Sequence, residues 1–124
     1  MKILITDDEQ IIRDTLNTIL TKAGHTTELA LDGAEALAKM KDDLYDVALL
    51  DIDMPKLNGY EVLQQVRAIY PTLPVIFITG SGESKKVAQS IAQYHLNAFI
   101  EKPFTPETVL DVVNKSTRPK SAEI

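Results

Sequence analysis

The sequence predicts an α/β fold, doubly wound, in which helices cover both faces of one five-stranded parallel sheet. Residues 47–50 and 75–78 are apolar at every position and are each followed by a polar residue, which is typical of central strands buried on both faces. Short apolar runs alternate with stretches whose apolar residues recur at helical spacing, and this alternation favours parallel strands joined by crossover helices. The length of 124 residues corresponds to about one domain.

The first expected strand, residues 2–6, is followed at once by an amphipathic helix that ends at Gly24. The acids at 7–9 suit the positive start of this helix. Its residues at helical spacing are Ile11, Ile12, Thr15, Leu16, Ile19 and Leu20. Residues 26–31 form a more polar second strand, which is expected near a sheet edge. Asp32 caps the second helix, because a glutamate three residues later completes the spacing of a capping box.

The third strand, residues 47–51, ends at Asp51, and the residues after it stop further pairing. Pro55 has no N–H group to donate, and the Asn58-Gly59 pair is typical of a turn. A third helix then has an apolar stripe made of Val62, Leu63, Val66 and Ile69. Because ligands bind at the carboxyl ends of the strands in open α/β sheets, Asp51 is expected to point into a site.

The rest of the chain completes the alternation of strands and helices. It holds expected strands at 75–79 and 98–101, and expected helices at 84–94 and from Pro106 onward, which makes five helices in all. Residues 116–124 have no pattern. The domain is therefore expected to span residues 1–115, followed by a flexible tail or the start of a linker.

The ends of these strands bring polar side chains to one edge of the sheet. The most hydrophobic strands belong in the interior, and the order 2-1-3-4-5 makes the ends of the first and third strands neighbours. Asp7, Asp8 and Asp51 would then share one pocket. Thr79 and Lys102, at the ends of the fourth and fifth strands, would flank it.

Such a pocket suits a cation and a phosphoryl group. Carboxylates in contact repel each other by about 4 kcal/mol per pair at a near-surface dielectric, so a cation must balance them. Oxygen ligands alone favour a hard divalent ion such as Mg2+. Asp51 would then attack a phosphoryl group, Lys102 and the metal would neutralise its oxygens, and Thr79 would donate a hydrogen bond to the product.

The composition points to protein partners. Eighteen acidic residues against 13 basic ones give a formal net charge of -5, and no basic cluster stands out, which argues against nucleic acid or an anionic membrane as a partner. The chain has no cysteine, which excludes disulfides and thiolate metal sites. The first apolar run is too short for a signal peptide or a membrane span, and a cytoplasmic location is expected.

Four motifs stand at the ends of expected strands. They are Asp7-Asp8, Asp51-Ile52-Asp53-Met54-Pro55 with Gly59, Thr79-Gly80, and Lys102-Pro103-Phe104. Together, in order and spacing and over nearly the whole chain, they resemble the response-regulator receiver domain of two-component signalling, which has a flavodoxin-like fold. The resemblance implies a phosphoacceptor signalling domain and not an enzyme.

The resemblance also implies the roles of the acidic residues. Asp51 would accept the phosphoryl group from a sensor histidine kinase or a histidine phosphotransfer protein. Asp8 and Asp51 would bind Mg2+ through their carboxylates, and Asp53 would bind it through its backbone carbonyl. Asp7 would act mainly through water.

The switch that the resemblance implies uses residues on the last two strands. Lys102 would contact the phosphoryl group, and the Lys102-Pro103 peptide bond would be cis. Phosphorylation would draw Thr79 toward the new oxygens, and Phe99, where many relatives have Tyr, would turn inward behind it. The surface of the fourth helix, fifth strand and fifth helix would change for a downstream effector protein or output domain. Phosphorylation-linked dimers are frequent in similar domains, so a homodimer is a further expectation.

Three rival functions use the same residues. The Asp51-x-Asp53 pattern also resembles the nucleophile motif of haloacid-dehalogenase-type phosphatases, but those enzymes carry it on the first strand, whereas an acid pair precedes it here. A receiver-like module that signals without phosphate is disfavoured by the full acidic pocket. A flavodoxin-like cofactor binder is disfavoured because no Ser/Thr-rich phosphate loop follows the first strand.

Overall fold

The computed structural model of the chain describes residues 1–54, 57–80, 87, 89, 93 and 96–116. Pro55, most of the helix expected at 84–94 and the tail after residue 116 lie outside this part of the chain. Within it the structure has five strands and four helices. None of the helices in these residues is long and apolar enough to cross a membrane.

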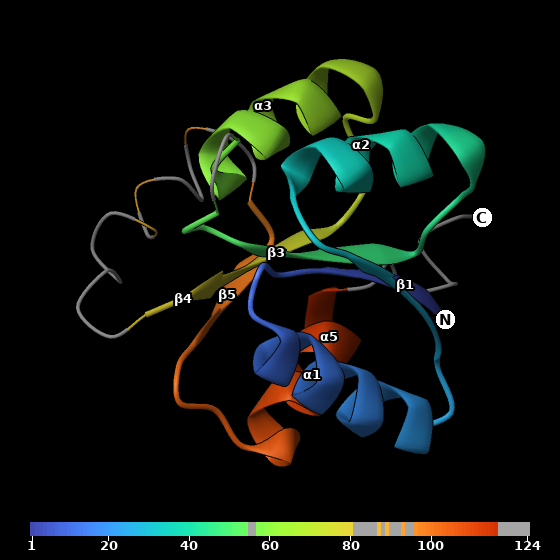
Figure 1. Cartoon of the computed structure of the whole chain (residues 1–124), viewed down its shortest axis with the longest axis vertical. Coiled ribbons are helices and arrows are strands. Elements are labelled where there is room, and N and C mark those ends of the chain that lie inside the picture. The colour runs from blue at the N-terminus through green and yellow to red at the C-terminus, as the bar shows by residue number, and fades with distance from the viewer. Residues whose placement is uncertain (55–56, 81–86, 88, 90–92, 94–95, 117–124) are drawn as a thin grey trace.

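Five parallel strands form one sheet in the order β2-β1-β3-β4-β5, so the predicted order is confirmed (Figure 1). The strands are β1 (Lys2–Thr6), β2 (Thr26–Ala30), β3 (Val47–Asp51), β4 (Val75–Thr79) and β5 (Ala98–Glu101). The polar β2 lies at one edge, as its composition predicts. The fully buried β3 and β4 lie inside the sheet.

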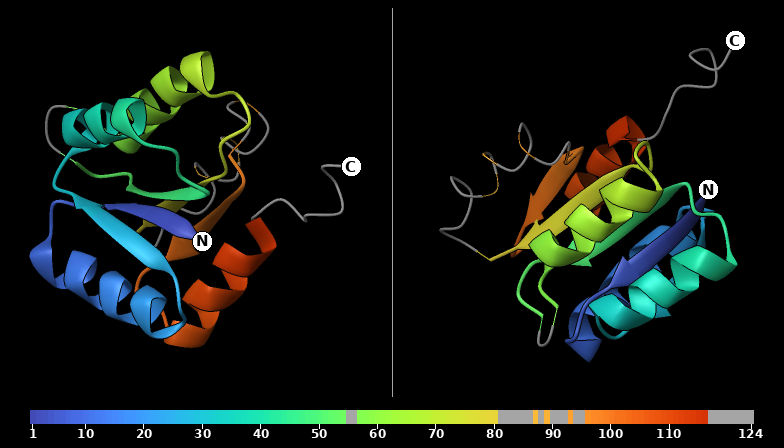
Figure 2. Two further views of the ribbon diagram at one scale, coloured as in Figure 1. Left: turned by 90° about the vertical axis from the view of Figure 1, so that its right-hand side faces the viewer. Right: turned by 90° about the horizontal axis from the view of Figure 1, so that it is seen from above.

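The helices lie in two layers, one on each face of the sheet (Figure 1 and Figure 2). On one face are α1 (Gln10–Lys22) and α5 (Pro106–Ser116), and on the other are α2 (Gly33–Asp42) and α3 (Gly59–Ile69). The doubly wound arrangement predicted from the alternation of apolar patterns is therefore confirmed.

The side chains of alternate residues in each strand point into two separate hydrophobic cores, one on each face of the sheet. Leu49 and Ile76 pack in the cluster that contains Leu16 of α1 and Val113 of α5. Their neighbours in sequence point the other way, and Phe77 is the largest fully buried side chain in the cluster beneath α2 and α3. Because each central strand is packed on both faces, the position of its carboxyl end is tightly determined.

The start of α3 corrects one prediction from the sequence. The Asn58-Gly59 pair, predicted as a turn, instead begins this helix, and Asn58 is its N-cap. The Asn58 Oδ1 accepts a hydrogen bond from the Glu61 N–H at 3.0 Å, and the Glu61 Oε1 accepts one from the Asn58 N–H at 3.3 Å. The turn prediction was wrong because Glu61 completes a capping box. At the start of α2, the Asp32 Oδ1 accepts from the Glu35 N–H at 2.8 Å, as predicted.

Gly59 is required because α3 starts very close to the end of β3. A Cβ atom at this position would lie 2.9 Å from the carbonyl oxygen of Asp51 and 2.9 Å from the Cα of Ile52. The Gly59 N–H donates to the carbonyl oxygen of Ile52 at 3.0 Å. The start of α3 is thus held by close packing and a hydrogen bond against the end of β3, where Asp51 lies.

Two isoleucines of the predicted helical stripes do not face the core, and Thr15 of the first stripe is also exposed. Ile11 and Ile69 are 78% and 50% exposed. Ile11 lies in the first turn of α1, and Ile69 is the last residue of α3. Helical spacing identifies the apolar face of a helix, but it does not show how far along that face the core extends.

Candidate functional site

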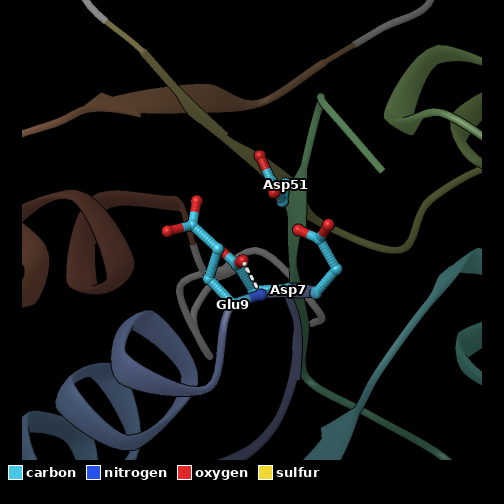
Figure 3. Close-up of side chains that lie close together, drawn as sticks. Asp7, Glu9 and Asp51 are labelled. Atoms are coloured by element: carbon cyan, nitrogen blue, oxygen red, sulfur yellow. Dashed lines mark hydrogen bonds between the residues drawn. The ribbon is translucent and has the colours of Figure 1, made fainter. Parts of the chain in front are cut away.

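The ends of β1 and β3 bring four acidic side chains together. The two strands are neighbours with Thr6 opposite Leu50, so the next residues, Asp7 and Asp51, lie side by side at the carboxyl ends of the strands. Asp8 follows Asp7, and Glu9 is the N-cap of α1. One carboxylate oxygen from each of the four acids lies within 4.8 Å of one from every other, and Figure 3 shows three of them.

Asp7 and Asp51 are almost fully buried, with 0% and 2% of their surface exposed. The Asp7 Oδ1 accepts a hydrogen bond from the Glu9 N–H at 2.8 Å, and the Asp51 Oδ1 accepts one from the Asp53 N–H at 3.2 Å. These local bonds orient both carboxylates. The Asp7 Oδ2 is also buried but has no hydrogen-bond partner. A buried carboxylate oxygen of this kind is costly unless a cation compensates it.

Lys102 is the cation that the described residues place against these acids. Its Nζ lies 3.6 Å from the Asp7 Oδ2, 3.6 Å from the Glu9 Oε1 and 3.8 Å from the Asp51 Oδ1. A charge-assisted hydrogen bond is shorter, about 2.7–2.9 Å. The ammonium group is therefore shared among three carboxylates and is bound closely to none of them.

The pocket keeps an excess of negative charge. The pKa of Asp51 is raised to about 7, first by burial and then by the charge of Asp7, while Lys102 opposes the rise. Burial likewise raises the pKa of Asp7, against the hydrogen bond from Glu9 and the charge of Lys102. Burial alone would lower the pKa of Lys102, but the neighbouring carboxylates outweigh it and hold that pKa above its usual value.

Thr79 and Lys102 are joined through the backbone at the ends of β4 and β5. The Lys102 N–H donates to the carbonyl oxygen of Thr79 at 2.7 Å. The buried Thr79 side chain donates through its Oγ1 to the carbonyl oxygen of Gly80 at 3.2 Å. The Lys102-Pro103 peptide bond is cis.

Phe99 and Asp53 lie at the margin of this arrangement. Phe99 is half-buried on β5, opposite Phe77 of β4, and packs against the core beneath α2 and α3. Asp53 has an exposed side chain, and its backbone is tied to the pocket through the hydrogen bond to Asp51.

The donors of the pocket fit a hard divalent cation. Four carboxylates supply oxygen ligands, which Mg2+ prefers in proteins. The unbonded Oδ2 of Asp7 adds a buried acceptor that a cation would satisfy. The pocket can therefore hold a cation beside the Asp51 carboxylate, which is itself a nucleophile.

Glu9 is the member of the cluster that the sequence did not identify. Its position suits the positive start of α1, so the sequence offers an ordinary explanation for an acidic residue there. In the structure its side chain makes no cap hydrogen bond and instead lies 3.6 Å from Lys102. The available signal is that Glu9 directly extends the Asp7-Asp8 pair.

Comparisons with known proteins agree with this geometry. The response regulator receiver domain family matches residues 3–114. Chemotaxis protein CheY of Thermotoga maritima is 33% identical over 118 residues, which cover 94% of this chain and 98% of that protein. Response regulator MprA of Mycobacterium ulcerans is 36% identical over 112 residues, which cover 89% of this chain and 47% of MprA. The chain thus spans about half the length of several relatives that it matches.

Solved structures give the same result. The receiver domain of NtrX from Brucella abortus has a TM-score of 0.88 at 34% identity, over 92% of this chain and 96% of that chain. Chemotaxis protein CheY4 of Vibrio cholerae has a TM-score of 0.87 at 32% identity, over 93% and 97% of the two chains. Because the sequence match extends over nearly all of the sheet and the helices that frame the acidic pocket, the chain belongs to the response regulator receiver domains of two-component signalling.

Proposed function

We propose that this domain accepts a phosphoryl group on Asp51 from a sensor histidine kinase or a histidine phosphotransfer protein. The observation that carries the proposal is the position of Asp51. It is buried at the carboxyl end of a central strand, and its Oδ1 lies 3.8 Å from the Nζ of Lys102. A carboxylate nucleophile beside a cationic group suits the transfer of an anionic group.

In the proposed step, a carboxylate oxygen of Asp51 attacks the phosphorus atom of a phosphohistidine. The new P–O bond forms as the P–N bond breaks, and the electron pair of the broken bond stays on the imidazole, which takes a proton from solvent. Asp51 must be ionised to attack, and Lys102 favours that form because it opposes the rise in the pKa of Asp51. Lys102 would then bind the phosphoryl oxygens.

The proposed cation is Mg2+. Asp8 and Asp51 would hold it through carboxylate oxygens, Asp53 through its backbone carbonyl, and Asp7 mainly through water. The buried, unbonded Oδ2 of Asp7 supports a cation at this place. The ion would supply positive charge to the phosphoryl oxygens and to the crowded carboxylates.

Phosphorylation would act on the rest of the domain through Thr79 and Phe99. The new group adds negative charge, and the Thr79 Oγ1 would exchange its bond to the Gly80 carbonyl for one to a phosphoryl oxygen. Phe99, which is half-buried at the edge of the core, would then turn inward. The surface around β5 and α5 would change for an effector protein, an output domain or a second copy of the chain. The phosphoryl group would shift the populations of two packings of similar energy.

We also propose residues 1–115 as the extent of the receiver domain.

Intact-mass measurement with a small phosphodonor tests the proposal. Wild type incubated with acetyl phosphate and Mg2+ should gain the mass of one phosphoryl group, and EDTA should abolish the gain. Asp51→Asn should gain nothing. Asp14→Asn, which removes a charge from the exposed side of α1 outside the acidic cluster, should behave as wild type.

A partner kinase provides the second arm of the test. If neither acetyl phosphate nor a phosphorylated kinase or phosphotransfer protein adds mass to wild type, Asp51 is not a phosphoacceptor. The receiver-like module that signals without phosphate would then replace this proposal. A gain that persists in Asp51→Asn would place the acceptor elsewhere.

A further inference from the structure

We propose that Glu9 is a positioning residue for Lys102, which holds the lysine ammonium group at the pocket when a divalent cation binds to Asp8 and Asp51, with Asp7 acting through water. The inference deepens the cation site proposed above and rests on it. It assigns a task to the member of the acidic cluster that has no role in the phosphoryl transfer described so far.

The three carboxylates near Lys102 differ in their exposure to solvent. Asp7 and Asp51 are buried, whereas 64% of the Glu9 side chain is exposed. Lys102 itself is intermediate, with 22% of its side chain exposed. Lys102 is therefore shared by two buried carboxylates and by one, Glu9, that is open to solvent.

A divalent cation in the pocket would change this balance. A cation held by Asp8 and Asp51, with Asp7 acting through water, would offset the negative charge that attracts the Lys102 ammonium group, whose Nζ lies 3.6 Å from the Asp7 Oδ2 and 3.8 Å from the Asp51 Oδ1. Asp7 and Asp51 would then hold Lys102 less strongly. The third carboxylate near Lys102 is that of Glu9, whose Oε1 lies 3.6 Å from the Lys102 Nζ. Glu9 is not a proposed ligand of the cation.

The Glu9 backbone is fixed while its side chain is not committed to the helix. The Glu9 N–H donates to the Asp7 Oδ1 at 2.8 Å, and the Glu9 carbonyl oxygen accepts from the Arg13 N–H at 3.1 Å. The side chain makes no cap hydrogen bond at the start of α1. The Glu9 side chain can therefore move with the Lys102 ammonium group without breaking a hydrogen bond of the helix. In this way it would keep the ammonium group close to the Asp51 carboxylate.

A direct effect of Glu9 on the cation has to be separated from this role. Both explanations predict weaker cation binding when the charge of Glu9 is removed. Only the positioning role makes that effect depend on the charge of Lys102. A double-mutant cycle measures this dependence, because it isolates the interaction between the two side chains.

Titration calorimetry with Mg2+ is the experiment, on wild type, Glu9→Gln, Lys102→Met and the double variant. Glu9→Gln should weaken Mg2+ binding about ten-fold, and in the Lys102→Met background the same substitution should weaken it by no more than about three-fold. Asp14→Asn should stay within about two-fold of wild type, because its charge is outside the cluster and screened. Circular dichroism checks that each variant folds.

Lys102→Arg provides a second background that keeps the charge, so the experiment does not depend on Lys102→Met folding. In this background the effect of Glu9→Gln should stay near ten-fold. Equal effects in the Lys102→Met and Lys102→Arg backgrounds would overturn the positioning role, and so would an unchanged affinity in Glu9→Gln. Absence of Mg2+ binding to wild type would instead contradict the proposed cation site itself, while the phosphoacceptor is tested separately by mass.

Discussion

Asp51→Asn is expected to stabilise the metal-free protein near neutral pH, although it removes the proposed phosphoacceptor. Burial and the charge of Asp7 raise the pKa of Asp51 from the ordinary value of 3.8 to about 7. Between these two values the folded protein keeps a proton that the unfolded chain releases. The contribution of Asp51 to the free energy of unfolding of wild type must therefore fall as the pH rises through this window. Asn has the same size and keeps an oxygen for the Asp53 N–H, but it carries no charge.

The magnitude follows from the width of the window. One pKa unit corresponds to about 1.4 kcal/mol, so a window of about three units sets an upper bound of about 4 kcal/mol. We expect Asp51→Asn to gain about 2–4 kcal/mol over wild type near pH 8, and the gain should vanish below about pH 4. Urea unfolding followed by circular dichroism in EDTA measures both proteins across this range. His25, whose pKa burial lowers, has the opposite pH dependence, but it is common to both proteins and cancels in the difference.

Added Mg2+ should reverse the order of stability. A cation that binds the folded state stabilises wild type by mass action, whereas Asp51→Asn lacks one of the proposed ligands. The control Asp14→Asn should change the free energy of unfolding by less than about 0.5 kcal/mol at every pH. If the free energy of unfolding of Asp51→Asn does not rise relative to that of metal-free wild type between about pH 5 and 8, the argument from burial is wrong.

Substitutions at three further residues test the framework around the pocket by urea unfolding. Gly59→Ala should lose about 2–3 kcal/mol, because its Cβ would lie 2.9 Å from backbone atoms at the end of β3, and a negligible loss would contradict that close approach. Asn58→Ala should lose about 1 kcal/mol with its capping bond, whereas Asn58→Asp, which keeps the acceptor, should lose little. Arg67→Met should lose about 2–3 kcal/mol, since its guanidinium donates to the Leu73 carbonyl at 2.6 Å and to the Asn97 Oδ1 at 3.1 Å. If the amide hydrogen exchange rates at the start of β4 are the same in Arg67→Met as in wild type, the bonds of Arg67 do not hold this strand in place.

The sheet could be predicted because its central strands are apolar on both faces. Residues 47–50 and 75–78 have no polar position that could face water, so they must lie between two layers. The first polar residue after each run then marks the edge of the core. Asp51 and Thr79 were placed correctly at the strand ends for this reason.

The ends of helices were harder to predict, because several side-chain roles share one residue pattern. Asn58-Gly59 is equally compatible with a turn and with a helix start, and the choice depends on Glu61 and on the close contact of Gly59 with β3. Ile11 fits the apolar stripe of α1 by spacing but is exposed. Periodicity describes one helix alone, whereas burial depends on where the next layer ends.

The residues of the site also differ in how well the sequence predicts them. Residues such as Asp7 and Asp51 follow from topology, because neighbouring strands with a known register deliver their last residues to one place. Glu9 depends on how the chain turns from β1 into α1, and this turn brings the Glu9 N–H to the Asp7 Oδ1. A local backbone bond of this kind has no signature in the spacing of residues.

The charge balance of the pocket links these observations to function. A fold selected for stability alone would pair each buried carboxylate closely, but Lys102 is shared among three acids at 3.6–3.8 Å and the Asp7 Oδ2 has no hydrogen bond. Burial therefore raises the pKa of both Asp7 and Asp51, and the metal-free protein bears this cost near neutral pH. A bound cation would relieve the cost and leave Asp51 ionised. The same charge imbalance that destabilises the metal-free pocket would thus supply affinity for a cation, and the bound cation would favour the ionised form of Asp51 that the proposed reaction needs.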